Sequence, residues 1–207
     1  MQNRVQHGLM KSQDVTQKKQ LYKDIIAVSN RHLCMRPFLE QIERVCACRP
    51  KALILREKDL AKSDYSMFAV QVLDICYRYE VPCLLHTYVE AARQLNHPYI
   101  HLPLHVLAQY AGKLKDFKEV GCSVHSVDEA CRAVSYGATY LTAGHIYATA
   151  CKPDVLPRGI EFLKEVCASV KVPVYAIGGL HPGSARIDEV ILVGAAGACV
   201  MSDMMQV

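Results

Sequence analysis

The sequence lacks several features that would assign it to a particular class of protein. No segment approaches the roughly 20 uninterrupted apolar residues of a membrane-spanning helix, and the first residues, 1–20, are polar, without a signal-peptide core. No G-x-G-x-x-G motif follows the first expected strand, at 24–29. We therefore expect a cytoplasmic protein that has no membrane partner and no dinucleotide-binding fold.

Neither sign of charge dominates the chain. It has 24 Lys and Arg residues against 20 Asp and Glu residues, for a net charge of +4. The two signs are interspersed, which argues against a nucleic-acid partner and mildly favours an anionic small-molecule ligand.

The ten cysteines are not spaced for a metal or redox site. Cys46 and Cys48 are separated by one residue, closer than in the usual C-x-x-C motif, and no second ligand pair follows them. We expect no metal and no cofactor. Most of the others lie in apolar periodic segments, as is typical of reduced thiols packed in a core: Cys76, Cys83, Cys122, Cys131, Cys167 and Cys199.

Short apolar segments alternate with segments of helical period along the chain. The apolar segments are four to eight residues long without strict alternation, which is typical of parallel strands covered on both faces. This alternation leaves a doubly wound sheet or a (β/α)₈ barrel. Polar residues at the strand ends favour the barrel. The expected strands are 24–29, 51–55, 81–86, 99–102, 120–124, 139–144, 172–179 and 196–202, and the expected helices are 36–48, 64–80, 89–96, 105–117, 126–137, 156–169 and 184–194.

The expected domain organisation is an N-terminal extension over 1–23 followed by one α/β barrel over 24–207. The chain stops five residues after Ser202, so the (β/α)₈ TIM barrel would lack its last helix. The N-terminal segment or a partner subunit would then cover the gap, which leaves a homodimer open.

Residues at the carboxyl ends of barrel strands usually form the active site. Gly178 and Gly179 end the seventh expected strand, and Met201 and Ser202 end the eighth. Many barrels hold phosphate at this place with backbone amides, so we predict a phosphate site here. Glycines also simply turn chains, which is the alternative.

Three cations lie near other strand ends. Arg56 and Lys58 follow the second expected strand, and Lys152 follows the sixth. Arg56 is suited to binding a carboxylate or phosphate with two hydrogen bonds. The alternatives are a salt bridge with Glu57 or Asp59 for the first two, and a solvated loop residue for Lys152.

Among nine histidines, His145 stands out because it follows a glycine at the end of the sixth expected strand. A neutral imidazole at this place is able to take and return a proton near neutral pH. His101 lies inside a strand and is expected to be a hydrogen-bonded core residue, and His125 is expected to tie loops together.

Five motifs carry a resemblance to a known family. They are LREKD (55–59), GCSVHSVDEA (121–130), AGHIYATACK (143–152), YAIGGLHP (175–182) and GAAGACVMSDM (194–204). In order and spacing the chain resembles the thiamine phosphate synthase superfamily over roughly residues 24–204. This resemblance implies a (β/α)₈ barrel, and contact of Ser123 and Lys152 with the substrate.

The superfamily contains two activities that differ in their need for metal. The synthase joins a pyrimidine pyrophosphate to a thiazole phosphate with Mg²⁺ held by aspartates, whereas thiazole tautomerase rearranges protons on a thiazole carboxylate phosphate without metal. Where the synthase has Asn-Asp after its third strand, this chain has His86-Thr87. The synthase's Gly-Gln-x-Asp stretch is replaced by residues 103–106, Pro-Leu-His-Val.

A third departure indicates the tautomerase. His145 stands where the synthase has Pro, and the tautomerase carries its catalytic His there. The resemblance therefore implies a metal-independent isomerase in thiamine biosynthesis, with His145 as acid and base, Arg56 on the carboxylate of a thiazole phosphate, and phosphate at the glycines. The alternatives are the synthase itself, which the intact Arg-Glu-Lys at Lys58 favours, and a non-catalytic regulatory or ligand-binding homologue.

Overall fold

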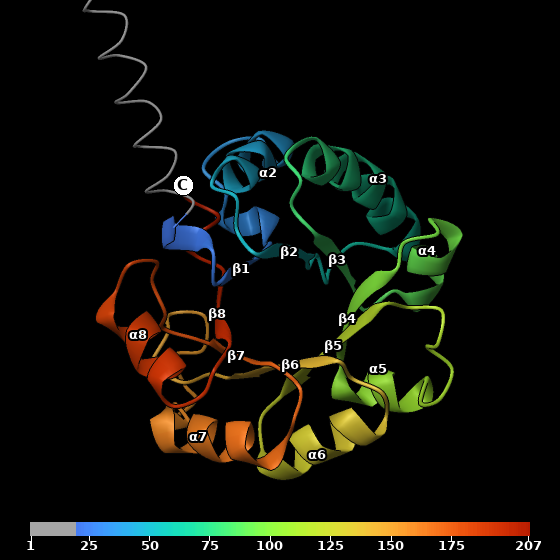
Figure 1. The fold of residues 1–207 in the computed structure, drawn as a ribbon. Coiled ribbons are helices and arrows are strands. Elements are labelled where there is room, and N and C mark those ends of the chain that lie inside the picture. Colours follow the sequence, from blue (N-terminus) through green and yellow to red (C-terminus); the bar gives the residue numbers. More distant parts are fainter. Residues whose placement is uncertain (1–19) are drawn as a thin grey trace, which may run out of the picture.

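The computed structural model describes residues 20–207 and contains a closed barrel of eight parallel strands (Figure 1). Each strand pairs with the next along the chain, and the first pairs with the last. The predicted (β/α)₈ barrel and all eight expected strands are confirmed. The strands are β1 (Ile25–Val28), β2 (Ala52–Leu55), β3 (Cys83–His86), β4 (Tyr99–Pro103), β5 (Glu119–Val124), β6 (Tyr140–Gly144), β7 (Val174–Ile177) and β8 (Gly197–Val200).

The helices form a ring outside the barrel (Figure 1). The helix expected over 105–117 ends early, since a turn containing Gly112 at a φ of +74° follows it. No helix among the described residues is long and apolar enough to cross a membrane. The helical elements are η1 (Arg31–Leu33), α2 (Phe38–Ala47), α3 (Lys62–Arg78), α4 (Val89–Gln94), α5 (Leu104–Gln109), α6 (Val127–Ser135), α7 (Gly159–Ser169) and α8 (Ala185–Leu192).

The end of the chain takes the place of an eighth helix. Residues 202–206 form turns in which Met204 and Met205 are fully buried. The Gln41 side chain of α2 donates a hydrogen bond to the Met204 carbonyl at 3.0 Å, and Arg36 donates one to the Val207 carbonyl at 2.7 Å. Within residues 20–207 these apolar turns cover the β1–β8 seam, and most of the predicted extension over 1–23 lies outside the described residues.

Two apolar layers hold the barrel. The larger lies between the helices and the outward side chains of the strands, and the smaller fills the barrel interior. Alternate residues of each strand point inward. The interior layer contains Ile26, Val28, Ala52, Ile54, Leu84, Tyr140, Tyr175 and Cys199.

Candidate active site

Strand register brings several inward-facing polar side chains to the carboxyl edge of the barrel. Leu55 pairs with Leu85, so Arg56 lies level with His86, and His86 pairs with His101. Further round the barrel, Ser123 pairs with Thr142. Every second residue of a strand faces the barrel interior. The inward side chains are therefore apolar in the middle of the barrel and polar at its carboxyl edge.

The three predicted cations lie near one another without carboxylate partners. Within residues 20–207, the side chains of Arg56, Lys58 and Lys152 form no hydrogen bond and no ion pair. Burial lowers the pKa of Arg56. Burial also lowers the pKa of Lys58, as do the positive charges of Arg56 and Lys152. An unpaired, half-buried guanidinium with two lysines beside it favours binding of an anion.

The salt bridges that were the alternative for Arg56 and Lys58 do not form. Glu57 points to the other side of the loop, where it accepts hydrogen bonds from Ser29 Oγ at 2.6 Å and from Arg31. Asp59 pairs with Arg31 and His32. The two carboxylates nearest in sequence are thus engaged with η1 and leave the cations unpaired.

A hydrogen-bond network around the buried His101 lies on the inward face of the neighbouring strands β4, β5 and β6. His101 Nδ1 is 2.8 Å from the Tyr140 hydroxyl, and His101 Nε2 is 2.8 Å from Ser123 Oγ. Thr142 donates a hydrogen bond to Ser123 Oγ at 3.2 Å. Gly121 makes this network fit, because a Cβ there would lie 2.1 Å from the Tyr140 ring.

Satisfaction of these hydrogen bonds assigns the tautomer of His101. The buried Tyr140 hydroxyl has one hydrogen-bond partner among the described residues, so its proton must go to Nδ1. Neutral His101 then carries its own proton on Nε2 and donates it to Ser123. Because Ser123 Oγ also accepts from Thr142, the Ser123 hydroxyl proton is left for a ligand. The sequence-based expectation of His101 as a hydrogen-bonded core residue is met, and it orients Ser123.

His86 faces the same opening. Its ring stacks on His101 at a centroid distance of 5.7 Å, and Thr87 Oγ1 is 2.6 Å from His86 Nδ1. His86 Nε2 has no protein partner, yet no fully buried polar side-chain atom among the described residues lacks one. The small exposed part of His86 therefore includes Nε2, at the level of Arg56.

Acid should destabilise the protein through these two histidines. Burial lowers the pKa of His101 from 6.5 to about 3, and burial followed by the nearby positive charges lowers that of His86. The unfolded chain binds protons that the folded chain refuses, so stability is complete above about pH 6.5 and falls as the pH drops toward 3. Urea unfolding at about pH 7 and about pH 5 measures this loss, and His101→Phe should reduce it. An unchanged difference in His101→Phe would contradict the assignment.

The predicted phosphate site has free backbone amides. Ile177 pairs with Cys199, so the ends of β7 and β8 lie level with each other. The amides of Gly179 and Ser202 donate no hydrogen bond to the described residues. Amides in this state are available to a bound anion.

The reason for the two glycines is protein packing rather than room for a ligand. Gly178 and Gly179 have φ angles of +103° and +67°. A Cβ on Gly178 would lie 2.2 Å from His145 Cβ, and one on Gly179 would lie 2.6 Å from the Ala148 carbonyl oxygen. The loop after β6 packs directly against this turn.

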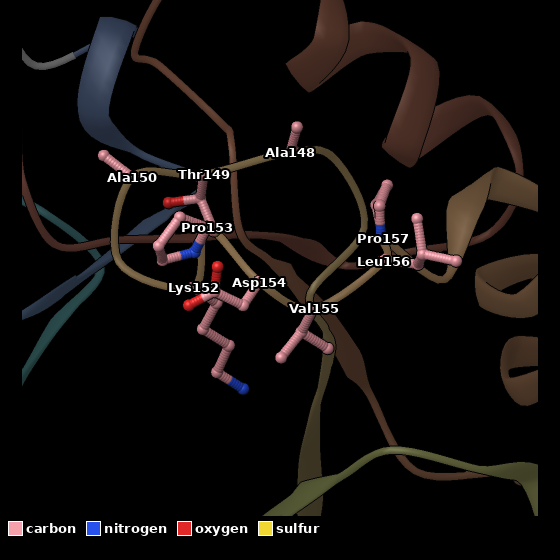
Figure 2. A pocket seen from close by; sticks show the side chains of 9 residues that line it. All are labelled: Ala148, Thr149, Ala150, Lys152, Pro153, Asp154, Val155, Leu156 and Pro157. Carbon is pink, nitrogen blue, oxygen red and sulfur yellow. The ribbon is translucent and has the colours of Figure 1, made fainter.

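The predicted catalytic His145 is buried beneath that loop, at 5% exposure. Its Nε2 donates a hydrogen bond to the Val155 carbonyl at 3.1 Å, and its own carbonyl accepts one from the Arg158 amide. Residues 148–157, without Cys151, line a cavity of about 550 Å³ (Figure 2). In Figure 2, Lys152 and Ala148 lie on opposite sides of the loop, and the Lys152 side chain points away from Ala148. In this structure His145 holds the loop that presents Lys152.

Sequence reasoning missed two members of the site, Tyr140 and Thr142, and placed His86 at a strand end without counting it among the site residues. The sequence did contain a signal for them, because side chains alternate between the two faces of a strand. Every second residue, counted back from the carboxyl end of each strand, therefore faces the barrel interior. Nothing in the linear sequence indicated that Tyr140 reaches across β5 to His101. His125 ties a loop as expected, because its backbone amide donates to Glu129 at 2.6 Å.

The fold and this edge define the class of the protein. It is a (β/α)₈ barrel with a group of polar and cationic side chains at the carboxyl ends of its strands, where barrels of this fold usually have their active sites. The chain belongs to the thiamine monophosphate synthase family, whose sequence model matches residues 25–204.

Named relatives agree with this family. A thiamine-phosphate synthase of Clostridium acetobutylicum is 31% identical over 189 residues, covering 89% of this chain and 87% of the relative. Thiamine-phosphate synthase 2 of Streptococcus pneumoniae is 32% identical over 185 residues, covering 86% of each. The solved thiamine phosphate pyrophosphorylase of Pyrococcus furiosus superposes with a TM-score of 0.74 at 26% identity, covering 90% of this chain and 89% of that one.

These relatives overturn the interpretation of the chain as a thiazole tautomerase, which is wrong. The relatives support the expectation that the chain is an enzyme. Their names are those of transferases, a synthase and a pyrophosphorylase, and not of an isomerase. The proton-shuttle role predicted for His145 from its position supported that interpretation, and it is not carried over to the transferase. The single residue that suggested it holds a loop instead.

The Mg²⁺ ion that the family implies does not fit the residues present. Both expected carboxylate positions carry other side chains, at Thr87 and Val106, and their histidine neighbours offer nitrogen. Mg²⁺ prefers carboxylate and water oxygens in near-octahedral geometry. Among residues 20–207, no group of three or more His, Cys, Asp or Glu side chains is arranged to hold a metal ion.

Proposed function

We propose that this chain is a transferase of the thiamine-phosphate synthase type, which joins a pyrimidine pyrophosphate to a thiazole phosphate. The observation that carries the proposal is the group of three unpaired cations, Arg56, Lys58 and Lys152, at the carboxyl edge of the barrel. A leaving pyrophosphate carries several negative charges, and such a group supplies matching positive charge. The synthase names of relatives at 31% and 32% identity support the same reaction class.

Each part of the edge has a distinct task in this proposal. The bond between the pyrimidine's carbon and the pyrophosphate oxygen breaks, and the oxygen keeps the electron pair as the thiazole nitrogen bonds to the carbon. Arg56 and the two lysines stabilise the charge that develops on that oxygen. Amides near Gly179 and Ser202 hold the thiazole phosphate.

Ser123 orients the substrate in this scheme. Its hydroxyl proton is directed outward because His101 and Thr142 both donate to its oxygen. Holding the two reactants in line at fixed distance accounts for much of the rate in a reaction that joins two molecules. The loop that His145 ties down presents Lys152.

Product analysis tests the proposal. Purified protein incubated with the pyrimidine pyrophosphate and the thiazole phosphate should form thiamine phosphate at about one turnover per second or faster. Chromatography of the product is run with Mg²⁺ and with EDTA. Lys118→Met is the control, since Lys118 lines a cavity at the opposite end of the barrel.

Absence of product under both conditions would contradict a transferase. If the protein nevertheless bound thiazole phosphate, the barrel would instead be a non-catalytic ligand-binding homologue. The missing carboxylate positions are the one observation that favours this second candidate.

A further inference from the structure

We propose that this chain binds the pyrophosphate group of its substrate without a divalent cation, through Arg56, Lys58 and Lys152 with His86 beside them. The identity of the ligand rests on the proposed function. The metal-free character rests on the donors and charges that the structure brings together.

Two of the carboxylates near the opening are already engaged. Glu57 is 2% exposed and accepts hydrogen bonds from Ser29 and Arg31. On the other side, Asp203 pairs with His181 at 2.8 Å. A metal brought to either of these two would compete with ion pairs and hydrogen bonds that are already formed. Asp154, exposed on the same loop as Lys152, has no ion pair among the described residues.

The remaining donors at the β3 end are neutral. Burial, and then the charges of nearby residues that include Arg56 and Lys58, lower the pKa of His86, and its free Nε2 faces the opening. The Thr87 hydroxyl is already hydrogen-bonded to His86 Nδ1, at 2.6 Å. A neutral imidazole is a poor ligand for Mg²⁺ but a good hydrogen-bond partner for a phosphate oxygen or its proton.

The local charge also opposes a free dication. Arg56, Lys58 and Lys152 carry like charges close together, and after burial the charges of Arg56 and Lys152 lower the pKa of Lys58 further. Adding Mg²⁺ would increase this repulsion, whereas a pyrophosphate anion would relieve it. The positive charge of the three cations is about equal to the negative charge of a pyrophosphate group near neutral pH. Neutralising the group therefore needs no further ion.

The backbone of Thr87, at the end of β3, has an unusual conformation. Thr87 has a φ of +70°, a conformation that β-branched residues rarely adopt and that Asp and Asn tolerate. Thr87→Asp is therefore compatible with the backbone and adds one carboxylate at the expected metal position. This variant tests whether a metal dependence of pyrophosphate binding is gained, whereas Arg56→Met tests whether the binding is lost.

The experiment is calorimetric titration of the full chain with inorganic pyrophosphate, in excess EDTA and in saturating Mg²⁺. We expect binding in EDTA, and equal or weaker binding in Mg²⁺, because the ion lowers the charge of the ligand. Arg56→Met should weaken binding in EDTA by about tenfold or more. Lys118→Met, at the opposite end of the barrel, should bind as the wild type does.

Thr87→Asp should reverse the metal dependence. In EDTA its added carboxylate should weaken pyrophosphate binding by about tenfold, and Mg²⁺ should restore it. Circular dichroism of each variant checks that the barrel is folded.

Three results would overturn the proposal: no binding in EDTA, wild-type binding tightened tenfold or more by Mg²⁺, or undiminished binding by folded Arg56→Met. Failure of the proposed function is separate. Pyrophosphate binding in EDTA without any thiamine phosphate formation would remove the transferase assignment and leave the metal-free anion site in place.

Discussion

Replacing Arg56 with methionine should lower kcat/KM for thiamine phosphate formation by about 10²–10³. Arg56 is half-buried, follows β2 directly, and has no carboxylate partner among the described residues. Methionine retains most of the length and apolar surface of the side chain but loses the charge. The transition state, in which negative charge gathers on the leaving oxygen, should suffer more than substrate binding, so kcat should fall as well as KM rise.

Two further variants make this result specific. Arg56→Lys retains the charge but loses the two-pronged donor geometry, and should recover only part of the activity. Lys118→Met removes a cation from the opposite end of the barrel and should retain wild-type kinetics. If Arg56→Met kept more than half of the wild-type kcat/KM, the leaving group would have to lie elsewhere along the edge.

The second large effect concerns His101, which orients Ser123. His101→Phe removes the acceptor of the Tyr140 proton and one of the two donors to Ser123 Oγ. A buried hydroxyl left without a partner costs about 1–3 kcal/mol of stability. Ser123 is then free to donate its proton to Thr142 rather than to the substrate, so kcat/KM should fall by about tenfold or more.

A double variant separates the structural from the positioning contribution. In His101→Phe with Tyr140→Phe, both members of the buried hydrogen bond are apolar, and most of the lost stability should return. Activity should not return, since Ser123 still lacks its donor. Urea unfolding and steady-state kinetics give the two readouts. Recovery of both together would show that His101 affects activity only through the stability of the fold.

The barrel itself was predictable because local patterns and global fold agree. Eight short apolar segments without alternation require cover on both faces, and the segments of helical period between them provide it. The helix expected over 105–117 was too long, because its apolar period continues into residues that pack as turns after Gly112. Periodicity reports which side of a segment is buried, and a turn that buries the same side gives the same signal.

The candidate site was only partly predictable. Arg56, Lys58 and Lys152 were found because strand ends are a short list in a parallel barrel. The tautomerase interpretation was wrong because one residue that differs from the synthase pattern, His145, was taken as the mark of another reaction. The environment of His145, burial together with a hydrogen bond to the Val155 carbonyl, is a property of the folded chain alone.

The parallel barrel, the family and the strand-end positions of the cations were predictable, since each depends on order and spacing along the chain. Tertiary structure alone decided which of those residues act together. His101, Tyr140 and Ser123 come from three different strands, and the direction of the Ser123 proton follows from a tautomer that only their joint burial assigns. Likewise, Glu57 is adjacent to Arg56 in sequence yet faces away from it, because neighbouring side chains at a strand end point to opposite sides.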